Sequence, residues 1–229
     1  MLLKKHFVTV QEFLDLILKY SKNVDCDAEN FVQSFNEFSR TDEMNKKMLA
    51  NITHAFIYQY LDEEDEKDWS PARFLKDIYE CHICVVNISQ CYVKGIIPLK
   101  SKNYFGTTEK ITTRMAEEVV SRIFDKTKRF KVEPVEVPEI KKIKLEQIST
   151  LDNARLIDVR IMPENPLSEK TDFLVENIPL KSIILNPYCI GNDLSQNFVL
   201  YCAKGYQSTL AADVLRKAGF INVYTVDVG

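Results

Sequence analysis

A cysteine at a strand-to-helix junction is the residue of this sequence best placed to do chemistry. The apolar run at 198–201 is typical of a buried strand, and Cys202 follows it directly. A short loop containing Gly205 then leads into an amphipathic stretch that predicts a helix. The backbone N–H groups of such a loop and the positive end of the helix both favour a thiolate over a thiol. We therefore expect Cys202 to act as a nucleophile; the alternative is a strand-end cysteine that is merely buried.

The loop after this cysteine has residue types suited to holding an anionic sulfur. Successive backbone N–H groups can turn inward and form an anion-binding nest. Gly205 permits a backbone angle that other residues resist, and Ser208 or Thr209 is predicted to cap the following helix. Lys204 supplies a positive charge nearby. The candidate loop consists of Ala203, Lys204, Gly205, Tyr206, Gln207 and Ser208.

Two further features belong to the candidate site. Asp158 and Arg160 end a predicted strand and lie two residues apart, so their side chains face the same side. We expect hydrogen bonds to hold this pair and give it a bracing role, with direct substrate contact as the alternative. Cys189 is interpreted as a plain loop cysteine. The alternative is a resolving cysteine that forms a disulfide with Cys202.

The elements that must position these residues alternate between strands and helices from residue 146 onward. Apolar runs predict strands at 156–160, 182–185, 198–201 and 222–226. The helix between the last two strands turns four side chains inward and ends before a glycine: Leu210, Ala211, Val214, Leu215 and then Gly219. This order predicts an α/β domain with a short parallel sheet flanked by helices.

The residues up to 124 predict an all-α helical bundle of about five helices. Asp27 is a candidate helix cap, and Ser70-Pro71 predicts the start of a long helix that runs to about Lys94. The acidic run 61–68 is interpreted as a solvated loop. Residues 125–145 contain two prolines and many charges, and they predict a linker. The predicted domains are therefore 1–124 and 146–229.

The cysteines of the first half suggest a metal only weakly. The stretch Cys81-His82-Ile83-Cys84 with Cys91 raises a zinc alternative. Cys81, Cys84, Ile88 and Cys91 share one predicted helix face, so buried core cysteines are favoured. His54 and His82 are interpreted as ordinary residues of the bundle. We expect no metal site and no cofactor.

Composition excludes several classes of protein. The 229 residues carry a net charge of −3 without a basic tract, so we expect no nucleic-acid partner. No apolar run is long enough to span a membrane, and the N-terminus does not look like a signal peptide. Six cysteines are too few for a disulfide scaffold, so a reducing cytoplasm is the expected location.

Residues 146–229 resemble the rhodanese family of sulfurtransferases. The resemblance lies in 156–160 with its Asp-x-Arg ending, the cysteine loop 199–208, and the helix–turn–strand 212–224. The segments 164–167, 175–178 and 192–196 look most similar to the C-terminal rhodanese domains of bacterial sulfurtransferases for tRNA 4-thiouridine and thiazole formation. The ATP-binding and RNA-binding regions of those enzymes have no counterpart here. In the rhodanese family this loop often has an arginine at the positions that Ala203 and Gln207 occupy here.

The resemblance implies a sulfurtransferase or persulfide carrier. Cys202 would accept sulfane sulfur from a thiosulfate-like anion or a protein persulfide and pass it to a thiol acceptor, and Asp158 and Arg160 would brace the active face. One alternative is a non-catalytic docking or regulatory module, with the rhodanese fold as the docking surface and the helical domain as the working part. The helical domain is also a candidate site for a protein partner. Another alternative is a phosphatase or arsenate reductase. That chemistry usually uses an arginine that closes the loop, and Gln207 and Ser208 stand there instead, which disfavours it. No family is recognised in residues 1–124.

Overall fold

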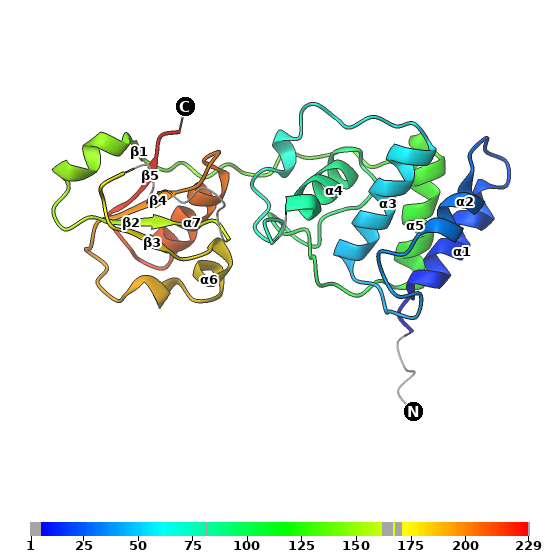
Figure 1. The fold of residues 1–229 in the computed structure, drawn as a ribbon, viewed down its shortest axis with the longest axis horizontal. Coiled ribbons are helices and arrows are strands. Elements are labelled where there is room, and N and C mark those ends of the chain that lie inside the picture. Colours follow the sequence, from blue (N-terminus) through cyan, green and yellow to red (C-terminus); the bar gives the residue numbers. More distant parts are fainter. Residues whose placement is uncertain (1–5, 81, 162–166, 168–170, 229) are drawn as a thin grey trace. The chain divides into compact units, whose positions relative to one another are not determined.

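The computed structural model describes residues 6–80, 82–161, 167 and 171–228, without the side chains of His82 and Ile83. The chain forms two compact units, Met1–Val135 and Glu136–Gly229 (Figure 1). Cys81 of the zinc alternative and residues 164–166 of the family resemblance lie outside the described residues.

Unit 1 is built from helices joined by irregular segments. Its α-helices are α1 (Val10–Ser21), α2 (Ala28–Ser34), α3 (Lys46–Tyr60), α4 (His82–Val93) and α5 (Thr113–Phe124). Four of them begin at a side chain that accepts a backbone N–H, as helix N-termini require: Thr9, Asp27, Asn45 and Thr112. The cap predicted at Asp27 is confirmed.

Aromatic and aliphatic side chains fill the core of unit 1. Helix α3 packs against α4, and α1 packs against α5 and α2. Phe13, Phe56 and Phe105 are fully buried, and the ring of Phe31 lies 5.0 Å from that of Phe56. Such burial is the main stabilising contribution to a domain of this size.

The long helix predicted from Ser70 is wrong. Only the short 3-10 turn η1 (Ser70–Ala72) forms there, and the next helix is α4, which starts at His82. The carboxylate of Asp77 accepts the backbone N–H groups of Phe105, Gly106 and Thr107 at 2.7–3.0 Å. This contact with a distant loop holds the segment in an irregular conformation that local propensity did not indicate.

The acidic run 61–68 is irregular, as expected, but it is not solvated throughout. The Glu63 side chain is 11% exposed, and Arg129 donates two hydrogen bonds to it at 2.6 and 2.8 Å. The buried Lys94 lies 3.3 Å from the same carboxylate. Burial raises the pKa of Glu63, but the hydrogen bonds and charges of Arg129, Lys94 and Lys126 outweigh it and lower the pKa to about 2.

Unit 2 contains a five-stranded sheet in the order β1-β5-β4-β2-β3, and every adjacent pair is parallel. The strands are β1 (Lys142–Ile143), β2 (Arg155–Asp158), β3 (Val175–Asn177), β4 (Phe198–Tyr201) and β5 (Val223–Val226). The remaining elements are α6 (Leu180–Leu185), α7 (Tyr206–Lys217) and the 3-10 turns η3 (Leu145–Thr150) and η5 (Pro187–Ile190); Figure 1 shows their arrangement. The predicted α/β domain with a parallel sheet is confirmed.

Two segments of the chain, 182–185 and the predicted linker 125–145, differ from the prediction. Residues 182–185 belong to helix α6, where Leu180 and Ile183 are buried at helical spacing, whereas the strand lies earlier at β3. A short apolar run fits either structure, so periodicity alone could not decide. The segment predicted as a linker is largely ordered, because Phe130 and Val135 pack on the core of unit 1 and β1 pairs with β5.

Both faces of the sheet are covered. Helix α7 buries Leu210, Ala211 and Leu215, while Leu156 and Val199 face a second cluster with Ile148 of η3. Cys202 therefore lies in a loop between a packed strand and a packed helix. None of the helices among the described residues has the length and apolar character needed to cross a membrane.

Candidate functional site

Cys202 lies immediately after β4 and is 2% exposed. The backbone N–H of Ser208 donates to its Sγ at 3.4 Å, and the thiol lies 3.5 Å from Ser208 Oγ, to which it donates. Ser208 Oγ in turn donates to the carbonyl of Gly205 at 3.2 Å. The loop thus closes on itself around the sulfur, and one backbone N–H already points at the atom that would carry negative charge.

The start of α7 differs from the sequence prediction in one respect. Gly205 is the N-cap, with a φ of 78° that favours glycine, and the helix begins at Tyr206. Ser208 and Thr209 therefore lie inside the helix, and the prediction that one of them caps it is wrong. The buried Ser208 side chain is turned toward Cys202.

The candidate loop residues differ in exposure. Ala203 and Lys204 are exposed, Gly205, Tyr206 and Gln207 are half-buried, and Ser208 is buried. The positive charge of Lys204 therefore lies at the surface, where water and salt screen it. The loop is closed around the sulfur on the Ser208 side and borders solvent on the Lys204 side.

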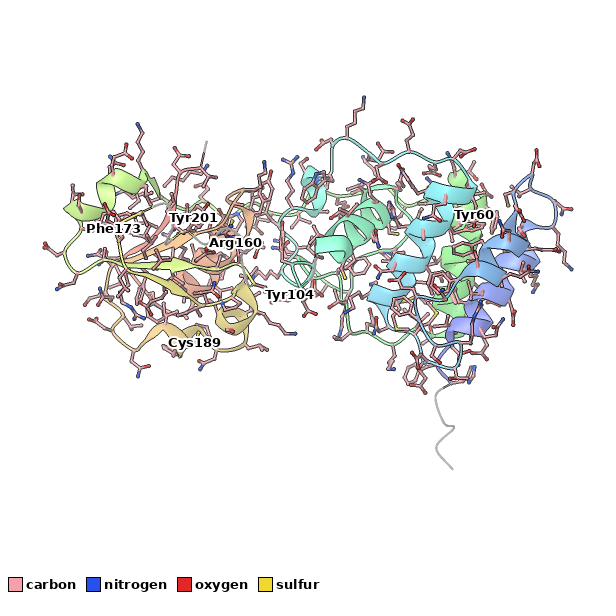
Figure 2. The ribbon with its side chains drawn as sticks, viewed as in Figure 1. Tyr60, Tyr104, Arg160, Phe173, Cys189 and Tyr201 are labelled. Carbon is pink, nitrogen blue, oxygen red and sulfur yellow. The ribbon has the colours of Figure 1, made fainter. Side chains whose placement is uncertain are left out.

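Asp158 and Arg160 form the pair that the sequence predicted. Asp158 is 1% exposed, and Arg160 donates to its carboxylate from Nε at 2.9 Å and from Nη2 at 2.6 Å. These hydrogen bonds raise the pKa of Arg160, and the nearby Tyr201 and Cys202 side chains add to the effect. The guanidinium lies 5.0 Å from the centre of the Tyr201 ring (Figure 2). The pair therefore contacts the residue that directly precedes Cys202.

Asn177 supports this pair and was missed in the sequence. Its Nδ2 donates to the carbonyls of both Asp158 and Arg160 at 2.9 Å, and this holds the turn after β2. An asparagine at the end of a three-residue strand carries no recognisable sequence signal. Only the pairing of β3 with β2 brings it to the site.

Cys189 lies away from Cys202. The neighbouring Tyr188 hydroxyl donates to the carbonyl of Ala218 at the C-terminal end of α7, whereas Cys202 precedes the N-terminal end. Twelve helical residues span about 18 Å. Figure 2 shows Cys189 well separated from Tyr201. Cys189 and Cys202 are both free thiols, and since a disulfide requires Cα atoms within about 7 Å, this arrangement does not favour a bridge between them.

The cysteines of unit 1 differ in burial and bonding. Cys84 is buried, as expected for a core cysteine, and it is disulfide-bonded. The described free thiols are Cys26, Cys91, Cys189 and Cys202. Cys91 is fully buried and burial raises its pKa, as expected for a core cysteine. Within the described residues no group of three His, Cys, Asp or Glu side chains could hold a metal, and the zinc alternative also needs Cys81, which lies outside them.

Comparison with known proteins adds little to this geometry. No protein-family model matches the chain, and no curated protein matches it. Among solved structures, a NAD-dependent persulfide reductase from A. fulgidus is 28% identical, with a TM-score of 0.30. The match covers 39% of this chain and 15% of that one. A likeness at this TM-score carries no argument about fold or function, so the case for the site rests on its own residues.

Proposed function

We propose that unit 2 is a rhodanese-like sulfur-transfer domain and that Cys202 carries sulfane sulfur as a persulfide. The observation that carries this proposal is the pair of contacts between Ser208 and the Cys202 sulfur, in a loop between a parallel strand and a helix N-terminus. A thiolate is the nucleophile of sulfur transfer, and the Ser208 N–H and the N-terminus of α7 both stabilise negative charge on the sulfur.

The chemistry needs one nucleophile and no cofactor. The Cys202 thiolate attacks the transferable sulfur of a donor and forms a new S–S bond, while the bond that held this sulfur breaks (S–S in thiosulfate or a persulfide, C–S in mercaptopyruvate) and the leaving group takes the electron pair. An acceptor thiolate then attacks the outer sulfur of the Cys202 persulfide and regenerates the Cys202 thiolate. The Ser208 N–H donates to the cysteine sulfur. In the thiol form the Ser208 hydroxyl accepts from Sγ and donates to the Gly205 carbonyl, and once the thiol has lost its proton this hydroxyl can turn and donate to the thiolate.

Asp158 and Arg160 act on this site through Tyr201. Val159, which lies between them, donates its N–H to the Tyr201 carbonyl at 3.0 Å, and the Arg160 guanidinium covers the Tyr201 ring. These contacts fix the end of β4 and hence the point from which the loop departs. We assign the pair a positioning role.

The 2% exposure of Cys202 also fits one competing function, a docking module without catalysis. Such a module would keep this thiol covered, and unit 1 would bind a protein partner. In that case Cys202 would be a core residue and its replacement would leave the protein's cellular role intact.

Mass spectrometry separates the two functions. The purified chain is incubated with thiosulfate, with mercaptopyruvate or with a low-molecular-weight persulfide, and its peptides are then mapped. We expect a mass gain of one sulfur atom on the peptide containing Cys202, abolished in Cys202→Ser and retained in Cys189→Ser. If no donor gives a mass gain, the docking function is favoured instead. Turnover of an aryl phosphate, measured separately, would point to a phosphatase.

A further inference from the structure

We propose that Cys84 belongs to a redox-active disulfide in unit 1, a centre that exchanges electrons with thiols and is separate from the Cys202 site. Cys84 is disulfide-bonded, whereas Cys26, Cys91, Cys189 and Cys202 are free thiols. Cys84 is therefore oxidised in a chain whose other described cysteines are reduced.

The partner of Cys84 follows from the number of cysteines. The sequence contains six, and four of them are free thiols, so Cys81 is the remaining cysteine that can close the bond. Cys81 lies outside the described residues, so the pairing rests on this count and on the spacing in the sequence. The spacing is Cys-x-x-Cys, which is characteristic of centres for thiol–disulfide exchange.

A bond between residues 81 and 84 would contribute little to the stability of unit 1. A disulfide stabilises a fold mainly by restricting the unfolded chain, and this effect grows with the length of the loop that the bond closes. Here the loop contains only two other residues. Helix α4 is held by packing instead, because Ile88 and Cys91 are fully buried and the helix packs against α3. Reversible redox chemistry therefore accounts for this bond better than a structural role does.

Cys84 lies in the first turn of α4, which begins at His82. The unpaired backbone N–H groups and the positive end of the helix dipole stabilise a thiolate at this position. A stabilised thiolate is a good leaving group, so the disulfide is easier to reduce. Cys84 is also 6% exposed, which suits the leaving thiol of the pair better than the sulfur that an incoming thiol attacks.

Cys91 lies on the same helix but takes no part in the exchange. It follows Cys84 by seven residues, which span about 10 Å of helix, and a disulfide requires Cα atoms within about 7 Å. Its thiol donates to the carbonyl of Ala50 at 3.4 Å, and burial raises its pKa. Cys91 therefore provides an internal reference for labelling experiments.

The exchange balances with two molecules of a thiol, R–SH, as the reductant. One R–S⁻ attacks the Cys81 sulfur, the protein S–S bond breaks, and Cys84 leaves as a thiolate with the electron pair. A second R–S⁻ attacks the R-side sulfur of the mixed disulfide and releases the Cys81 thiolate. The two thiols are oxidised to R–S–S–R, and the protein pair gains two electrons and two protons.

Differential alkylation of the full chain tests the proposal. The protein is equilibrated with mixtures of reduced and oxidised glutathione, quenched with N-ethylmaleimide in denaturant and digested with trypsin. The peptide Asp77–Lys94 contains Cys81, Cys84 and Cys91, so it takes one label when the pair is oxidised and three when it is reduced. We expect at least half of the pair to be reduced at about 10 mM reduced glutathione, and oxidised glutathione to restore it, whereas a structural disulfide resists this reductant.

Two controls accompany this titration. Cys91→Ser should change the label counts to zero and two without moving the glutathione ratio at half reduction. Trp69 packs on the core of unit 1, and its emission maximum should not change on reduction, since the bond does not hold the fold. Resistance to glutathione, unfolding on reduction, three labels under every condition, or a bond from Cys84 to another cysteine would each overturn the proposal.

Discussion

Arg160 donates to both carboxylate oxygens of Asp158, from Nε at 2.9 Å and from Nη2 at 2.6 Å, and it does so from only two residues away along the chain. The bonds bend the chain after β2 and set the guanidinium against Tyr201. A second bidentate pair in the same unit, Arg155 with Glu176, has side chains that are 33% and 34% exposed. The Arg160–Asp158 and Arg155–Glu176 pairs therefore have similar geometry but differ in how deeply they are buried.

Asp158→Asn should destabilise unit 2 by about 3 kcal/mol, because it leaves a largely buried guanidinium without its counter-charge. Glu176→Gln is the matched control and should cost about 1 kcal/mol or less, since its pair is a third exposed. Hydrogen exchange of peptides covering β2 and β4 measures the opening free energy of this unit. Equal losses in the two variants would contradict the role assigned to burial.

Ser208→Ala should slow sulfur loading of Cys202 by about tenfold, because it removes the hydroxyl beside the sulfur that can turn and donate to the thiolate, while the backbone N–H remains. Thr209→Ser keeps a hydroxyl one residue further along the helix and should load like wild type. The measurement is the rate of the one-sulfur mass gain. An unchanged rate in Ser208→Ala would mean that the backbone N–H alone sustains the site.

Cys189→Ser should leave both the loading of Cys202 and the release of its sulfur within about twofold of wild type, since a disulfide cannot span the length of α7. Peptide mapping under non-reducing conditions, after the loaded protein has turned over, checks this expectation. A stoichiometric Cys189–Cys202 peptide would show that α7 moves or unfolds during the reaction.

The sequence predicted the elements on either side of the candidate loop better than it predicted what surrounds the loop. Cys202, Gly205, Asp158 and Arg160 are close in sequence to these elements, and the predicted strands and helix around them agree with β2, β4 and α7. Asn177 reaches the pair only through strand pairing, and no local pattern reveals such a partner. The same reason accounts for the wrong helix at Ser70, where Asp77 binds a loop almost thirty residues further along the chain.

The buried Glu63 shows the same limit for charged segments. A run of acidic residues predicts a solvated loop, and for its neighbours Glu64 and Asp65 the structure agrees, since both are exposed. Glu63 is an exception because Arg129, from the segment predicted as a linker, lies against it. Charge pattern along the chain does not reveal which member of a run meets a distant partner.

Glu63 should make the stability of unit 1 depend on acid pH. Its pKa falls from 4.5 to about 2 on folding, so its contribution of about 3 kcal/mol is present above pH 4.5 and is lost as the pH falls toward 2. Glu63→Gln should therefore be less stable than wild type by about this amount at pH 7, and the difference should shrink as the pH falls. Trp69 is the single tryptophan and packs on the core of unit 1, so its fluorescence reports unfolding of that unit.

Glu64→Gln is the control for this pH dependence. The Glu64 side chain is exposed, so its replacement should change stability by less than about 0.5 kcal/mol at any pH between 3 and 7. A constant difference between Glu63→Gln and wild type across that range would contradict the assigned pKa.

The position of β5 has a consequence for how the chain is made. β5 is the last strand in sequence, yet it lies between β4 and β1, so β1 has no partner in the sheet until residues 223–226 have been synthesised. All of unit 1 precedes β1 on the ribosome. We therefore expect unit 1 to fold while translation continues, and the cysteine loop to assemble only after β5 has emerged from the exit tunnel.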